Sequence, residues 1–165
     1  MTKKTSLLIG YTLLAFECYR KFAVLCCRSK LVKFRHSHAR NNPDMFTLSI
    51  QKEIAAAHRL RNYDGPCARI HGHNWKIRVE VCAEKLDHAG IAIDFSDIET
   101  LLWQIIGPFD HQNFNDIAPF DKINPTAENI SRFVYQKMKQ LLPDGILIKN
   151  VQLWETDTYR VTYEE

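Results

Sequence analysis

The stretch CARIHGHNWKIRVEV, residues 67–81, decides the fold of this 165-residue chain. From residue 71 onward, its odd and even positions differ in character. The odd positions are His71, His73, Trp75, Ile77, Val79 and Val81, and the even positions are Gly72, Asn74, Lys76, Arg78 and Glu80. Successive side chains of a β-strand point to opposite faces, so this alternation predicts a strand over 71–81 with one buried face. Both histidines belong to that buried face.

A second predicted strand precedes this one. Phe46, Leu48 and Ile50 alternate with polar residues, and the pattern runs on toward AAAHRL at 55–60. The segment RNYDGPCAR at 61–69 carries Asp-Gly-Pro and is typical of a loop. We therefore expect the two strands to be neighbours joined by this loop.

Two helices are predicted after the strands. Ser96 stands three residues before Glu99, which is the spacing of a capping box, and apolar residues at helical spacing follow until Gly107. Thr126 is the predicted N-cap of the second helix, and the Pro-Asp-Gly turn at 143–145 ends it.

Two further strands complete the chain. Their alternating residues are Val151, Leu153 and Glu155 in the third strand, and Tyr159, Val161 and Tyr163 in the fourth. The order β-β-α-α-β-β predicts an α+β fold, with an antiparallel sheet and two helices on one face.

The charge of the chain is unevenly distributed. The formal net charge is +3, but residues 1–44 hold nine of the 22 basic residues and two of the 19 acidic ones, which leaves −4 on the remainder. We therefore expect no nucleic-acid partner. Apolar residues make up 45% and charged residues 25% of the chain, a composition typical of a soluble globular domain.

The cysteine count argues against a disulfide framework. There are five cysteines, at Cys18, Cys26, Cys27, Cys67 and Cys82. An odd number, with three of them inside residues 1–44, favours a reducing compartment, so we expect a cytoplasmic protein.

The first 44 residues differ from the rest. The apolar run at 6–16 is shorter than the roughly 20 residues that a membrane span needs, and no signal-peptide cleavage site follows it. A regular pattern begins only at Met45. We expect 45–165 to be the folded domain and 1–44 to be an unstructured extension or to precede the natural start. The HSH at 36–38 lies outside any strand pattern, so we expect no metal site there.

Histidines on one strand face can share a metal ion. The Cα atoms of His71 and His73 are expected to lie roughly 6.6 Å apart, which is twice the strand rise. His58 ends the preceding strand and can supply a third nitrogen if the two strands pair. Three neutral imidazoles suit zinc best, with iron or copper as alternatives. We expect no membrane partner for this site.

Cys67 leaves two kinds of zinc site open. As a fourth ligand it would close a structural Cys-His₃ tetrahedron. As a free thiol beside an open ion it would be a catalytic base or nucleophile, since a nearby cation favours the thiolate. Sites with three histidines usually keep a position for water or substrate, which favours the open site.

Two carboxylates add to this picture. Asp110 precedes His111, and a neighbouring carboxylate can fix the tautomer of a histidine that shuttles protons. Glu155 shares its strand face with apolar residues, so it needs a partner: either a buried ion pair or a ligand with paired N–H donors.

Six segments of the chain together resemble one known family. These are AAAHRL, C-x3-H-G-H-N, IDFSDIE, FDHQNFND, NPTAENI and WET, in this order. In this combination they are similar to the 6-pyruvoyl-tetrahydropterin synthase / 6-carboxy-tetrahydropterin synthase family. The resemblance covers about 45–165 and leaves 1–44 unmatched.

The resemblance implies a fold and an assembly. The fold is the tunnelling fold, in which subunits join their sheets into an oligomeric barrel. It also implies a homo-oligomer, commonly a hexamer, with active sites between subunits. Such an assembly agrees with the two open edges that a four-stranded sheet leaves.

The resemblance also implies residue roles. His58, His71 and His73 correspond to the zinc ligands, one ion per subunit. Cys67 corresponds to the thiol that abstracts a proton, and Asp110 with His111 to a second acid–base unit. Glu155 corresponds to the anchor of the pterin ring, with a role in proton relay as the alternative. Thr126 is a further candidate for contact with the ring, besides its role as a cap.

Spacing within the family favours one reaction. Members that form a pyruvoyl product typically have five residues between the cysteine and His-Gly-His, whereas this chain has three, at 68–70. That resembles the bacterial 6-carboxytetrahydropterin synthases of queuosine biosynthesis, which convert 7,8-dihydroneopterin triphosphate to 6-carboxy-5,6,7,8-tetrahydropterin, acetaldehyde and triphosphate. A folate-related subgroup has glutamate in place of Cys67 and is disfavoured. Arg59, Arg61 and Arg69 are candidates for the triphosphate, although solvated surface is the simpler interpretation of each.

Two alternative functions stay open at this point. The nearer one is the same fold with 6-pyruvoyl chemistry. The more distant one is a non-catalytic protein stabilised by zinc, for which the Asp110–His111 pair and Glu155 would have no use.

Overall fold

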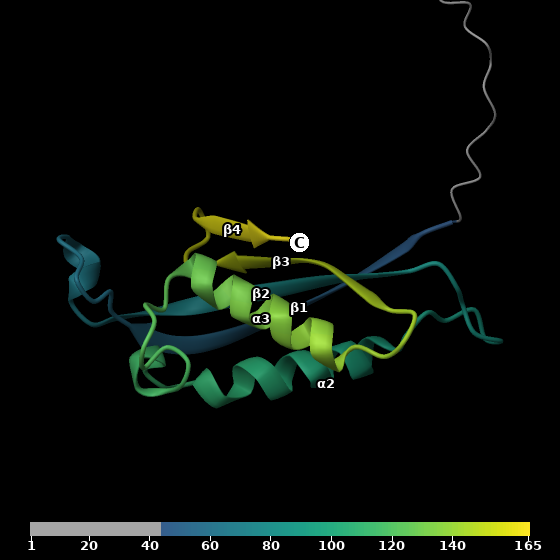
Figure 1. The fold of residues 1–165 in the computed structure, drawn as a ribbon, viewed down its shortest axis with the longest axis horizontal. Coiled ribbons are helices and arrows are strands. Elements are labelled where there is room, and N and C mark those ends of the chain that lie inside the picture. Colours follow the sequence, from purple (N-terminus) through teal and green to yellow (C-terminus); the bar gives the residue numbers. More distant parts are fainter. Residues whose placement is uncertain (1–43) are drawn as a thin grey trace, which may run out of the picture. The chain divides into compact units, whose positions relative to one another are not determined.

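The computed structural model describes residues 44–165, which form a four-stranded sheet with two helices (Figure 1). The strands are β1 (Phe46–His58), β2 (His71–Ala83), β3 (Leu147–Trp154) and β4 (Arg160–Tyr163). The helices are α2 (Phe95–Ile106) and α3 (Ala127–Leu141), and short 3₁₀ turns occur at η1 (Pro66–Ala68), η2 (Gly107–Phe109) and η3 (Phe114–Asp116). The predicted α+β order is confirmed.

The sheet has the strand order β1-β2-β3-β4, and every neighbouring pair is antiparallel. β1 and β2 pair along their whole length, from Phe46 opposite Ala83 to His58 opposite His71. The loop at 61–69 therefore joins two paired strands, as the sequence predicts. This register places His58 at the same end of the strand pair as His71 and His73.

The core lies between one sheet face and both helices. The residues of β2 that alternate with polar ones, Trp75, Ile77, Val79 and Val81, are completely buried. α2 packs against β1, whereas α3 packs against β3 and β4, and in Figure 1 both helices run lengthwise along the strands. Burial of this apolar face is the main stabilising term of the domain, and it holds the ends of β1 and β2 together.

The N-cap of α2 differs from the prediction. The cap is Asp94, whose carboxylate accepts hydrogen bonds from the Ser96 backbone N–H and the Ser96 hydroxyl, each at 2.7 Å. These two bonds lower the pKa of Asp94. The predicted capping box of Ser96 and Glu99 is thus wrong, because a carboxylate two residues earlier takes the cap, and Glu99 pairs with Lys52 instead.

The cap of α3 is as predicted. The Thr126 hydroxyl accepts a hydrogen bond from the Asn129 backbone N–H at 3.2 Å, and the helix begins at the next residue, Ala127. At the end of the chain, β4 begins at Arg160, so Tyr159 lies in the turn before the strand and not within it.

Some expectations concern residues that the structure does not describe. The proposed extension over 1–44, except for Asp44, and the HSH at 36–38 lie outside the described residues. Within 44–165, neither helix combines the length and the apolar character needed to cross a lipid bilayer.

Candidate metal centre and active site

Three histidines meet at the end of the β1–β2 pair. The register places His58 opposite His71, and Ala56 opposite His73. The Nε2 atoms of His58 and His71 lie 3.0 Å apart, and the His73 ring lies 5.4 Å from the His58 ring between centroids. The two strands therefore pair, which is the condition under which His58 can supply a third nitrogen.

A carboxylate joins the three imidazoles. Glu155 follows β3, and its Oε1 atom lies 3.2 Å from Nε2 of His58 and 3.4 Å from Nε2 of His73. The potential ligand atoms of these histidines, of His71 and of Glu155 all lie within 4.8 Å of one another. Among the residues that the structure describes, they form the one such group of metal-ligating side chains.

The hydrogen bonds behind the cluster fix two tautomers. Nδ1 of His58 lies 2.8 Å from the carbonyl oxygen of Pro125, and Nδ1 of His71 lies 2.7 Å from that of Arg69. A carbonyl oxygen only accepts, so each Nδ1 carries a proton and donates it. In the neutral rings both Nε2 atoms are then left with lone pairs, which is the usual arrangement of metal-bound histidine.

The lone pairs need a partner. Two unprotonated nitrogens 3.0 Å apart cannot hydrogen bond to each other, and the buried Nε2 atom of His73 makes no hydrogen bond. Burial lowers the pKa of His58 and of His73, which favours neutral rings. Three neutral imidazoles and a carboxylate fit a divalent cation, and the donor types suit zinc.

Aromatic packing supports the cluster from the core side. The Trp75 ring lies 4.9 Å from the His58 ring and 5.3 Å from the His73 ring between centroids. Its indole N–H donates to the carbonyl oxygen of Ala56 at 3.1 Å, so the buried ring leaves no donor unpaired. A fully buried residue thus packs against two of the three histidines.

Cys67 lies beside the donor group and not within it. It belongs to the short turn η1, and its carbonyl oxygen accepts the Leu60 N–H at 2.8 Å. The residue is half-buried with a free thiol. Within 44–165, the fourth residue of the donor group is Glu155 and not Cys67. The thiol instead lines a hollow of about 690 Å³ together with His58, Thr126 and Glu155.

Asp110 holds His111 at the edge of β1. Its carboxylate accepts the Ala55 N–H at 3.0 Å and lies 3.1 Å from Nδ1 of His111. The bond from Ala55 lowers the pKa of Asp110. His111 has a positive φ of 55° and donates its backbone N–H to the Ala55 carbonyl oxygen at 2.6 Å. The pair is fixed to the strand, while the imidazole stays exposed.

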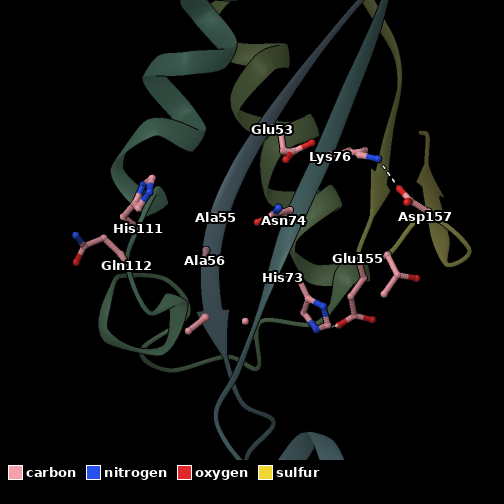
Figure 2. A pocket seen from close by; sticks show the side chains of 13 residues that line it. Glu53, Ala55, Ala56, His73, Asn74, Lys76, His111, Gln112, Glu155 and Asp157 are labelled. Carbon is pink, nitrogen blue, oxygen red and sulfur yellow. Dashed lines mark hydrogen bonds and ion pairs between the residues drawn. The ribbon is translucent and has the colours of Figure 1, made fainter.

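The structure separates His111 from Cys67 within one chain. His111 lines a second hollow, of about 830 Å³, together with His73 and Glu155. Figure 2 shows His73 and Glu155 pointing toward one another, whereas His111 lies apart from them, next to β1. Glu155 borders both hollows, and it is the residue that connects the two halves of the predicted site.

The three arginines line a third hollow, and Arg61 also borders the Cys67 hollow. Arg59, Arg61 and Arg69 line a space of about 650 Å³ next to η1. The guanidinium of Arg61 donates to the carbonyl oxygens of Ile123, at 3.1 Å, and of Phe120. Arg61 therefore ties the loop before α3 to the loop after β1, which is a structural role.

Two functional contacts are absent from the sequence prediction. They are the carbonyl oxygens of Pro125 and Arg69, which set the histidine tautomers. Every residue has a carbonyl group, so no residue type marks these positions. The place of Glu155 in the donor group was likewise not predicted, although its predicted apolar strand face indicated that it needs a partner. Glu155 lies just after β3, which ends at Trp154, and not within the strand as predicted.

Comparison with known proteins places the chain in a family. A profile of the family described as 6-pyruvoyl tetrahydropterin synthase matches residues 47–165. This chain belongs to that family. The resemblance drawn from the sequence motifs is thereby confirmed, and the family is one of pterin synthases.

Two relatives within this pterin synthase family show how the similarity is distributed. A 6-carboxy-5,6,7,8-tetrahydropterin synthase of Haemophilus influenzae is 31% identical over 143 residues, covering 73% of this chain and 100% of the relative. A 6-pyruvoyl tetrahydrobiopterin synthase of Pongo abelii is 33% identical over 96 residues, covering 57% of this chain and 66% of the relative.

A solved structure supports the fold. The 6-pyruvoyl tetrahydropterin synthase of Caenorhabditis elegans superimposes with a TM-score of 0.68 at 23% identity, over 74% of this chain and 96% of that one. The predicted tunnelling fold is confirmed for the single subunit.

Proposed function

We propose that this protein is a zinc-dependent 6-carboxytetrahydropterin synthase. It would convert 7,8-dihydroneopterin triphosphate and water to 6-carboxy-5,6,7,8-tetrahydropterin, acetaldehyde and triphosphate, a reaction of queuosine biosynthesis. The observation that carries the proposal is the pair of facing Nε2 atoms in His58 and His71, with Cys67 and Glu155 on the adjoining hollow. A cluster that favours a bound cation lies here beside a free thiol. This arrangement suits the removal of a proton from a C–H group next to an oxygen atom.

The histidines are the proposed zinc ligands. The ligand atoms of His58, His71 and His73 lie within 4.8 Å of one another, and the rings of His58 and His71 are held by backbone carbonyls. Bound zinc supplies Lewis acidity, which makes protons next to a ligand's oxygen atoms easier to remove. The carbonyl contacts orient the rings before any ligand arrives.

Cys67 is the proposed base. Its thiol lines the hollow beside the ligand cluster, and a neighbouring cation favours the thiolate. The thiolate takes a proton from the substrate side chain. His111, held by Asp110, returns or relays protons during loss of triphosphate and the retro-aldol-like cleavage that releases acetaldehyde.

Glu155 is the proposed anchor of the pterin ring. A pterin presents adjacent ring and amino N–H groups, and a carboxylate can accept both. Because Glu155 borders both hollows, a ring held there lies within reach of residues on either side. Proton relay, as an alternative role, is compatible with the same position.

We further propose a homo-oligomer, with the hexamer as the expected form. Cys67 and His111 line different hollows of one chain, so a neighbouring subunit is the simplest source of a second acid–base group for each thiol. The outer edge of β4, and that of β1 before Ala55, where residues 110–113 begin to cover it, offer backbone groups for that association.

The second candidate is 6-pyruvoyl-tetrahydropterin synthase activity. The similarity to the Pongo abelii protein favours it, whereas the three-residue gap between Cys67 and His71 and the full-length match to the Haemophilus influenzae protein favour the 6-carboxy reaction.

Product identification tests the proposal. Full-length protein loaded with zinc is incubated with 7,8-dihydroneopterin triphosphate, and the pterin product is identified by mass spectrometry together with an assay for acetaldehyde. A 6-carboxy product with acetaldehyde supports the proposal. A pyruvoyl product contradicts the 6-carboxy reaction and supports the second candidate. The absence of any product from folded, zinc-loaded protein contradicts an enzymatic role.

A further inference from the structure

Two exposed tyrosines line the hollow that contains Cys67 and Glu155. Tyr63 is 49% exposed and Tyr159 is 69% exposed, and neither takes part in the proposed acid–base chemistry. Single exposed aromatic residues are common on protein surfaces. Here two of them line one hollow, beside a thiol and a carboxylate. Each also belongs to a segment that carries one of these two reactive groups.

Tyr159 is tied to Glu155 by the turn between them. The Glu155 N–H donates to the carbonyl oxygen of Tyr159 at 3.2 Å, which closes the turn. The Thr156 hydroxyl oxygen accepts the N–H groups of Thr158, at 3.3 Å, and of Tyr159, at 3.2 Å. The five residues 155–159 therefore present one carboxylate and one aromatic ring from a single hydrogen-bonded unit.

Tyr63 is tied to Cys67 in a similar way. Its ring lies on the backbone of Gly65, where an added Cβ would be 2.6 Å from the Tyr63 Cε1 atom. The Gly65 carbonyl oxygen accepts the Ala68 N–H at 3.0 Å, so the glycine is part of the same turn as Cys67. A side chain at position 65 would shift the ring, so Gly65 lets Tyr63 pack against the turn that carries Cys67.

We propose that Tyr63 and Tyr159 bind the flat face of the ligand's heteroaromatic ring while Glu155 accepts the N–H groups at its edge. This inference rests on the proposed function and adds two positioning residues to it. A hollow of about 690 Å³ is large enough for a bicyclic ring. Aromatic side chains stack on such rings whatever their substituents, so the tyrosines supply affinity and the carboxylate supplies selectivity.

A phosphate-free ligand tests the ring contact by itself. The probe is neopterin, and its dissociation constant is measured by calorimetry on full-length, zinc-loaded protein. Tyr159→Ala and Tyr63→Ala are each expected to raise the dissociation constant about tenfold, while Tyr159→Phe and Tyr63→Phe stay within about twofold of the wild type. Because it shifts the ring, Gly65→Ala should also weaken binding, but by less than Tyr63→Ala.

The matched control is Phe95→Ala. Phe95 is 56% exposed, but it lines a separate apolar hollow, so its removal should leave neopterin binding unchanged. Circular dichroism and zinc content establish that each variant is folded and loaded. If Tyr159→Ala does not fold, Tyr159→Leu takes its place, because it keeps apolar volume and removes the aromatic face.

The outcomes separate the two proposals. Weaker binding in both alanine variants, with rescue by phenylalanine, supports the aromatic contacts. Wild-type affinity in both alanine variants overturns them and leaves the pterin function standing. If the wild-type protein does not bind neopterin but forms a pterin product from the triphosphate, the aromatic contacts fall and the pterin function stands. If it forms no product either, both fall.

Discussion

The Nε2 atoms of His58 and His71 lie 3.0 Å apart, although the Nδ1 atom of each ring donates to a backbone carbonyl. With both protons on Nδ1, the facing nitrogens hold lone pairs that repel each other. Charging either ring would relieve this, but burial lowers the pKa of His58. A bound cation removes the repulsion without a proton, and this relationship is the reason for assigning the cluster to a metal.

We expect His71→Ala to lose zinc and activity together. Removing one of three imidazoles leaves too few ligands for tight binding, so zinc content should fall from about one ion per chain to near zero. Elemental analysis of the purified protein measures this, with His88→Ala as a control because His88 is exposed outside the cluster. Undiminished zinc in His71→Ala would remove this residue from the ligand set.

Cys67→Ala is expected to keep its zinc and lose turnover. The thiol lies outside the donor group, and loss of a general base typically lowers kcat by about 10²- to 10⁴-fold. Steady-state kinetics and zinc content are measured on the same preparation. Cys82→Ala is the control, since it removes a second half-buried free thiol. If zinc leaves with Cys67, the closed structural site is correct.

Glu155→Gln should weaken neopterin binding about tenfold or more while zinc content is maintained. The substitution keeps the shape of the side chain but removes the charge that strengthens its hydrogen bonds to ring N–H groups. Calorimetry gives the affinity. Asp157→Asn is the control, because this carboxylate lies in the same turn and pairs with Lys76. Loss of zinc from Glu155→Gln would assign the carboxylate to the metal instead.

Thr126→Ala tests a cap against a ligand contact. The hydroxyl caps α3, so its loss should cost about 1 kcal/mol of stability, and Thr126→Ser should recover most of it. Thermal denaturation measures the loss. A parallel neopterin titration decides whether Thr126 also contacts the ring: a weaker affinity in Thr126→Ala at temperatures where it is folded shows the contact.

Asp110 should contribute a pH-dependent part of the stability. Its pKa lies below the ordinary value of 3.8, chiefly because the ionised carboxylate accepts the Ala55 N–H. The stabilisation is therefore complete above about pH 4, and it disappears as the pH falls through the lowered pKa. We expect Asp110→Asn to be less stable at neutral pH and to lose less on acidification. Melting temperatures between pH 7 and pH 3 measure this, and parallel curves for the two proteins would contradict it.

Local pattern was enough to predict most of the fold. The alternation over 71–81 placed His71 and His73 on the same strand face as the buried Trp75, because the period of a strand is fixed by its backbone geometry. Thr126 was also recognised as a cap, because a helix cap depends only on residues two or three positions away. Where two polar residues competed for one helix end, the pattern failed: Asp94 caps α2 and Ser96 does not.

The sequence motifs identified the family and the candidate residues, but they did not show which side chains lie close together. Pro125 lies 67 residues from His58, and its carbonyl oxygen fixes the tautomer of that ring. Glu155 enters the metal-ligating group only because β3 pairs with β2.

The sequence by itself therefore determined the order of strands and helices along the chain, the strand face that carries His71 and His73, and the chemical types at the site, since these depend on neighbours along the chain. Only the tertiary structure decided that Cys67 lies outside the donor group and that His111 lines a different hollow from it. The physical reason is that packing of the helices and pairing of the strands set distances between residues far apart in the chain, and no local pattern encodes those distances.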